Sequence, residues 1–111
     1  MQRTWDERVA AAVARVEARL DRSDSFDCWL WPGARNNNRI NRHAYGVVSI
    51  PTGEGKKVRT FYVHRLLYQH HVGPIPEGLE VDHLCNIKIC VNPDHMELVT
   101  HAENMRRISS R

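Results

Sequence analysis

Hydrophobic residues near the N-terminus recur at helical spacing. They are separated by steps of four, four, three and four, and they predict one apolar helix face over residues 4–22: Trp5, Val9, Val13, Val16 and Leu20. Thr4 and Glu7 have the Thr-x-x-Glu spacing of a capping box. We favour a surface helix that packs on the core; the alternative is an arm that contacts phosphates or a second subunit.

Between this helix and the next regular pattern, the chain is irregular. Residues 28–31, Cys-Trp-Leu-Trp, form a short apolar run that Pro32 and Gly33 end. Residues 34–44 are rich in Asn and Arg, lack periodicity and predict a loop. The loop is either a solvated connection or a phosphate-contacting segment, because Arg and Asn are common DNA-contacting side chains.

The remaining pattern predicts a hairpin followed by a strand–loop–strand–helix unit. Residues 45–50 and 58–63 are β-rich, and the joining PTGEGKK segment contains turn glycines. Residues 64–72 predict a helix ended by Gly73 and Pro74, with Leu66, Leu67 and His70 on a buried face. Strands at 79–82 and 96–99 then flank a loop and a short turn, and a terminal helix opens at Thr100. The predicted fold is α+β, with a C-terminal ββα unit.

Composition limits the class of protein. The 111 residues make one domain, and 41% hydrophobic with 26% charged residues excludes collagen-like and low-complexity chains. No apolar run approaches the ~20 residues of a membrane-spanning helix. The N-terminal segment also lacks a secretory pattern, so we expect an intracellular protein that contacts no membrane. A net charge of +3 is compatible with a nucleic-acid partner.

Cysteine and histidine positions predict a zinc site. The chain has three cysteines, an odd number that does not suit a closed disulfide framework. Cys85, Cys90 and His95 lie within eleven residues, and Cys28 completes a set of four N/S donors of the kind that a structural Zn²⁺ requires. The alternative is three buried thiols and a surface histidine.

A second constellation predicts phosphodiester chemistry. His83 ends the first strand of the ββα unit, and Asn104 lies in the first turn of its helix, so packing the helix on the strands brings both toward one cleft. A neutral imidazole can take a proton from water at physiological pH. Asp82 and Asn104 offer oxygen ligands suited to Mg²⁺. Each of the three residues taken alone has an ordinary structural explanation.

These motifs resemble a known family. The string GLEVDHLCNIKICVNPDHMELVTHAEN is similar to HNH endonucleases of the phage and homing type, in the ββα-metal or His-Me finger group, and His-Cys-box relatives share its interleaved zinc ligands. The upstream DCWLWPGA, AYG and VHRLLY segments extend the likeness from about Asp27 to Arg107. The stretch between Cys85 and Cys90 is NIKI, where relatives often carry more Arg; Lys88 keeps one charge there. The last motif residue is Asn104 rather than His.

The resemblance implies roles for single residues. His83 matches the general base, Asp82 and Asn104 match the ligands of one catalytic Mg²⁺ or Mn²⁺, and one structural Zn²⁺ per chain matches the Cys28, Cys85, Cys90 and His95 set. We expect a single HNH endonuclease domain over residues 1–111, with an N-terminal helical extension at 1–23 and a zinc-stapled catalytic core at 79–109.

The implied activity is metal-dependent cleavage of double-stranded DNA by a monomer or homodimer, in a phage or bacterial host. The expected DNA-binding residues are basic or lie in the basic segments: Arg35, Arg39, Arg42, Arg59, His64, Arg65, Lys88, Arg106 and Arg107. His64 could equally be a packing residue. Two alternatives remain: a zinc-stapled DNA-binding module without catalysis, and an RNA- or structure-specific nuclease.

Overall fold

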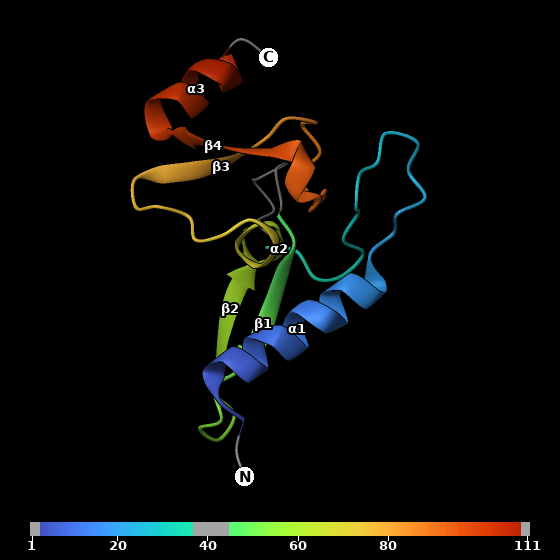
Figure 1. Cartoon of the computed structure of the whole chain (residues 1–111), viewed down its shortest axis with the longest axis vertical. Coiled ribbons are helices and arrows are strands. Elements are labelled where there is room, and N and C mark those ends of the chain that lie inside the picture. The colour runs from blue at the N-terminus through green and yellow to red at the C-terminus, as the bar shows by residue number, and fades with distance from the viewer. Residues whose placement is uncertain (1–2, 37–44, 110–111) are drawn as a thin grey trace.

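The computed structural model describes residues 3–36 and 45–109, and it confirms the α+β class (Figure 1). The elements follow in chain order: α1 (Trp5–Arg19), β1 (Val47–Pro51), β2 (Val58–Tyr62), α2 (Val63–His71), β3 (Leu79–His83), the 3₁₀ turn η1 (Pro93–His95), β4 (Met96–Thr100) and α3 (His101–Ser109). The strand–loop–strand–helix order of the C-terminal third is the one that the sequence predicts.

Helix α1 begins with the predicted capping box. The Thr4 N–H donates to Glu7 Oε1 over 3.0 Å, and the Glu7 N–H donates to Thr4 Oγ1 over 3.2 Å. The helix ends at Arg19, three residues before the predicted end, because Asp21 exchanges two backbone hydrogen bonds with Leu30 (3.0 and 2.9 Å). Its buried face contacts β1 and α2, which supports the interpretation of α1 as a core-packing helix.

The strands form two separate antiparallel pairs. In the first, Val47 lies opposite Tyr62 and Pro51 opposite Val58; in the second, Leu79 lies opposite Thr100. Helix α2 follows β2 directly, and α3 follows β4 directly. Figure 1 shows α2, seen end-on, between the two hairpins, with α3 on the β3–β4 pair at the opposite end of the molecule from the N-terminus.

One apolar cluster connects these parts. It draws on α1, the segment at residues 28–31, α2 and the β3–β4 region: Val13, Val16, Trp31, Val63, Leu66, Leu67, Val81, Val91 and Met96. The expected burial of Leu66 and Leu67 is confirmed, but that of His70 is wrong, since this side chain is exposed. It belongs to the last turn of α2, where His70 and His71 lie beside Glu17 of α1 rather than over the core.

Within residues 3–36 and 45–109, no helix has the length and apolar character needed to cross a membrane.

Candidate active site

The four predicted zinc donors come together in the structure. Cys85 and Cys90 lie in the loop after β3, His95 ends η1, and Cys28 comes from the N-terminal half; their donor atoms all lie within 4.8 Å of one another. His95 Nδ1 is 3.6 Å from Cys28 Sγ and 3.5 Å from Cys90 Sγ. Tetrahedral Zn²⁺ with ordinary Zn–S and Zn–N bonds places such donors about 3.5 Å apart, so the cluster fits this ion.

Backbone pairing brings Cys28 to the cluster. The Trp31 N–H donates to the Ile89 carbonyl over 3.0 Å, and the Val91 N–H donates to the Trp29 carbonyl over 2.8 Å. Apart from the apolar run at residues 28–31, no pattern in the chain predicts this pairing. Asn92 adds a further bond, because its side-chain amide donates to the Asp27 carbonyl over 2.7 Å.

The protonation of the two buried cysteines depends on whether a cation is bound. Burial raises the pKa of both the Cys28 and the Cys90 thiols, so without a metal they are protonated at neutral pH. A thiophilic divalent ion stabilises the thiolate form, and its binding free energy is then largely folding free energy.

His83 is connected to this cluster through Cys90. The imidazole is 1% exposed, and its Nε2 lies 3.1 Å from the Cys90 carbonyl oxygen. A carbonyl oxygen only accepts hydrogen bonds, so Nε2 carries the proton and Nδ1 carries the basic lone pair. The residue that supplies one zinc donor thus also sets the tautomer of the predicted base.

Three aromatic rings, including that of His83, pack together next to the four-donor cluster. The His83 and His64 rings are 4.8 Å apart, and Tyr45 stacks on His64 at 4.9 Å. His64 is 6% exposed, and its buried Nδ1 has no hydrogen-bond partner among the described residues. Desolvation, with smaller contributions from His83, Arg65 and Lys88, lowers the pKa of His64 from 6.5 to about 3. A buried neutral ring favours the packing interpretation of His64 over direct phosphate contact.

A cavity of about 230 Å³ adjoins these rings. It is lined by Tyr45, Tyr62, His64, Arg65, Glu80, Val81 and Asn104. His83 packs against two of these lining residues, Tyr45 and His64. The predicted metal ligand Asn104 and the residues that pack against the predicted base therefore line one cavity, between α2, β3 and α3.

Glu80 is a cavity residue that the sequence analysis did not identify. Asn104 Nδ2 donates to Glu80 Oε2 over 2.9 Å, and His101 Nδ1 lies 2.8 Å from Glu80 Oε1. These two contacts lower the pKa of the Glu80 carboxyl. The alternation of side chains along β3 could have identified Glu80. Residues 80 and 82 lie on the same face of the strand, and this face packs against α3.

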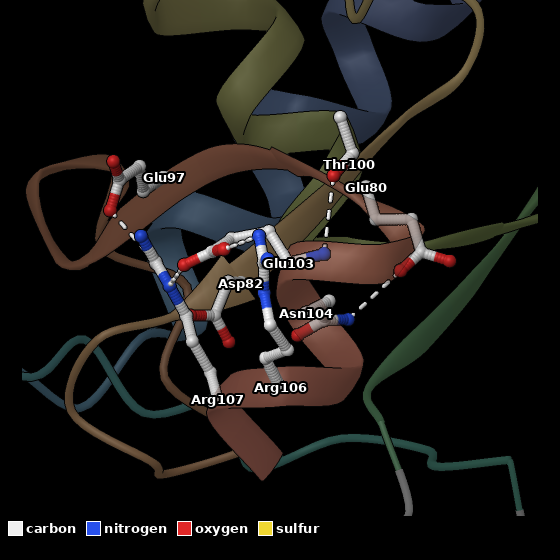
Figure 2. A network of polar contacts seen from close by, with 8 residues as sticks. All are labelled: Glu80, Asp82, Glu97, Thr100, Glu103, Asn104, Arg106 and Arg107. Atoms are coloured by element: carbon white, nitrogen blue, oxygen red, sulfur yellow. Dashed lines mark hydrogen bonds and ion pairs between the residues drawn. The ribbon is translucent and has the colours of Figure 1, made fainter. Parts of the chain in front are cut away.

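Asp82 is held by an arginine. Its side chain is 2% exposed, and Oδ2 accepts from Arg107 Nη1 over 3.0 Å. The same guanidinium contacts Glu97 at 2.9 Å and Glu103 at 3.2 Å, as the dashed lines in Figure 2 show for the residues of this network. Arg107, predicted to bind DNA, is thus surrounded by three carboxylates in this structure.

The other predicted DNA-binding residues have different surroundings. Arg65 lines the cavity, and the Lys88 ammonium lies 5.6 Å from the centre of the Tyr45 ring. Arg106 is exposed and pairs with Glu103, whereas Arg59 lies over the Trp5 ring of α1. Arg35 is exposed, and Arg39 and Arg42 lie outside the described residues.

The first prediction concerns the metal. Purified protein is expected to contain about one zinc ion per chain by elemental analysis, as a closed four-donor site requires. Cys28→Ala should lose the zinc and unfold or aggregate, although residue 28 is remote from the other donors in sequence. His70→Ala, which removes an exposed histidine outside the cluster, should keep both zinc and fold. A metal-free preparation with native circular dichroism and melting would contradict the assignment.

The second prediction concerns acid stability. Because the folded state holds His64 neutral to about pH 3 whereas the unfolded state binds a proton near pH 6.5, stability is lost as pH falls through 6.5. Between about pH 7.5 and 5 this single group should remove roughly 2 kcal/mol of unfolding free energy. His64→Phe keeps a ring in the stack but removes the titration, so its urea-unfolding free energy should fall less over this range. Parallel pH profiles of the two proteins would refute a neutral buried His64.

Comparison with known proteins agrees with this geometry. Residues 61–106 match the family model described as HNH endonuclease. The uncharacterized gene 5.3 protein of Enterobacteria phage T3 is 29% identical over 69 residues, covering 62% of this chain and 68% of that protein. Protein 2.8 and protein 7.7 of Escherichia phage T7 are 36% and 33% identical over 72% and 70% of this chain.

The matched part is about half of each T7 protein, 48% and 52% of their lengths. No solved structure matches the chain significantly. The segment that matches the family model runs from β2 into α3. It contains β3, β4 and the start of α3, with His83, three of the four cluster donors and Asn104. Over residues 61–106, this chain is therefore similar to the HNH endonucleases.

Proposed function

We propose that this protein is a DNA endonuclease that hydrolyses phosphodiester bonds with His83 as general base and one divalent metal held by α3. The observation that carries the proposal is the Cys90 carbonyl on His83 Nε2, at 3.1 Å. This bond gives the imidazole the tautomer that a base requires, beside a cavity that Asn104 also lines. The similarity of residues 61–106 to HNH endonucleases supports this reaction class.

His83 would take a proton from the attacking water through Nδ1. The Nε2–H···O=C bond stabilises the imidazolium that forms, because the positive ring donates more strongly to the carbonyl than the neutral ring does. Zinc, by fixing Cys90 Sγ, would hold that carbonyl in place. A structural ion held by the four donors would thus aid catalysis by helping to position the base rather than by contacting DNA.

Asn104 Oδ1 and the Asp82 carboxylate are the proposed ligands of the catalytic Mg²⁺ or Mn²⁺. Both are hard oxygen donors, on α3 and β3, and such ions retain water molecules and bind substrate phosphate. When bound, the ion would stabilise charge on the phosphate and on the leaving 3′ oxygen. Asp82 can join Asn104 only if it shares or exchanges its contact with Arg107.

Basic side chains around the cavity would hold the DNA backbone. Arg65 would neutralise the scissile phosphate, and its exposure and its place in the cavity lining support this role. Lys88, Arg106 and Arg35 would contact flanking phosphates. A single ββα unit cuts one strand at a time, so we expect nicked product from a monomer and linear product from a dimer or a second encounter. The expected ends are 5′-phosphate and 3′-hydroxyl.

Two substitutions should separate the base from the metal ligand. His83→Ala should leave zinc content, fold and DNA affinity nearly unchanged and lower single-turnover plasmid nicking by roughly 10²–10⁴-fold, the usual contribution of a positioned acid–base group. Asn104→Ala should also stop nicking, but through weaker metal binding, so raising Mg²⁺ or Mn²⁺ should partly restore it.

His70→Ala, at an exposed site on α2, serves as the control and should nick at the wild-type rate. A metal titration that restores His83→Ala as well as Asn104→Ala, or wild-type rates in His83→Ala, would reject His83 as the base.

A further inference from the structure

Asn104 is held in one orientation by a carboxylate on the neighbouring strand. Its Nδ2 lies 2.9 Å from Glu80 Oε2, and Glu80 belongs to β3 whereas Asn104 belongs to α3. In the view of Figure 2, the Asn104 nitrogen faces Glu80 and the Asn104 oxygen lies on the other side of the amide. Both residues line the same cavity.

The chemistry of the pair allows only this orientation. An ionised carboxylate accepts hydrogen bonds and cannot donate, so the Asn104 amide must turn its N–H₂ group to Glu80. The amide oxygen, the only atom of this side chain that can coordinate a cation, is then directed away from Glu80. Without a hydrogen-bond acceptor at position 80, the Asn104 amide could adopt either of its two flipped orientations. In one of them its nitrogen would occupy the position of Oδ1.

Glu80 is itself fixed from a second side. His101 Nδ1 lies 2.8 Å from Oε1, so the two carboxylate oxygens contact different residues of α3. His101 and Asn104 are three positions apart and therefore lie on one face of the helix. On β3, Glu80 is half-exposed and lies in register opposite Val99 of β4. The carboxylate thus has a defined position relative to the start of α3.

A carboxylate here opposes the binding of a polyanion. It lines the cavity beside Arg65, where the scissile phosphate would lie, and like charges at this distance weaken DNA binding. A neutral residue could hold α3 on β3 without this penalty. We propose that Glu80 is a positioning residue, which orients the Asn104 amide so that Oδ1 is presented to the divalent metal. This inference rests on the proposed role of Asn104 as a metal ligand.

The experiment measures metal binding without catalysis. Mn²⁺ is titrated into zinc-loaded protein without DNA, and free Mn²⁺ is read from its electron paramagnetic resonance signal. All proteins carry His70→Ala and His71→Ala, because these histidines lie with Glu17 in a second group of potential donors. Zinc content and melting temperature are measured for each protein, so that loss of fold is separated from loss of Mn²⁺.

Glu80→Ala should weaken Mn²⁺ binding by about 10–100-fold, the usual effect of removing a group that orients a metal ligand. Glu80→Gln should retain most of the affinity, because its Oε1 can still accept from Asn104 Nδ2. The matched control is His101→Ala, which removes the other contact of Glu80 and leaves that with Asn104. It should change the affinity by no more than a few-fold.

Four outcomes distinguish a positioning role of Glu80 from direct metal ligation and from no role. Wild-type affinity in Glu80→Ala overturns the proposal. Equal losses in Glu80→Gln and Glu80→Ala also overturn it, because they identify Glu80 as a direct ligand whose charge is required. Asn104→Ala separates this inference from the proposed function: wild-type affinity in that variant rejects Asn104 as a ligand, whereas loss in Asn104→Ala without loss in Glu80→Ala rejects only the role of Glu80.

Discussion

The contacts of Cys90 connect the four-donor cluster, the predicted base and the N-terminal half of the chain. Its Sγ belongs to the four-donor cluster, its carbonyl accepts from His83 Nε2, and its backbone lies beside Leu30 in an isolated bridge. The N-terminal half, the four-donor cluster and the predicted base therefore meet at one residue. A chain of 111 residues buries a limited core, and a metal ion bound by these four donors would add to its stability.

Successive side chains of strand β3 point to opposite faces, one toward the core and the histidine rings and the other toward α3. Val81 contributes to the apolar cluster and His83 packs against His64, whereas Glu80 and Asp82 contact α3. Glu80 contacts His101 and Asn104 of the helix, whereas Asp82 contacts Arg107, three positions after Asn104. The consequence is that α3 carries both a proposed metal ligand and a cation that neutralises the other proposed ligand.

Local rules predicted much of this arrangement. Spacing and capping residues gave α1 and the ββα order, and the requirement for four N/S donors identified Cys28 as the partner of the C-terminal three. Contacts between distant segments were not predictable, because the pairing of residues 28–31 with 89–91 leaves no periodicity in either segment. Glu80 and the Asp82–Arg107 ion pair were missed for a related reason: they depend on how α3 sits on β3. His70 is exposed because it lies in the last turn of α2, beside Glu17 rather than over the core, and this position could not be predicted from the spacing of residues within the helix.

The most direct measurement of the central claim is cleavage of supercoiled plasmid by the zinc-loaded wild-type protein, in Mg²⁺ and in buffer without added divalent metal. If the zinc cluster positions the base and one metal on α3 assists it, nicked circles should form in Mg²⁺ and not in buffer without added divalent metal. DNA ligase should reseal these nicks, because they carry 5′-phosphate and 3′-hydroxyl ends. Intact plasmid in Mg²⁺ and Mn²⁺, with DNA still bound by the protein, would contradict the account and identify a binding module that uses zinc only for its fold.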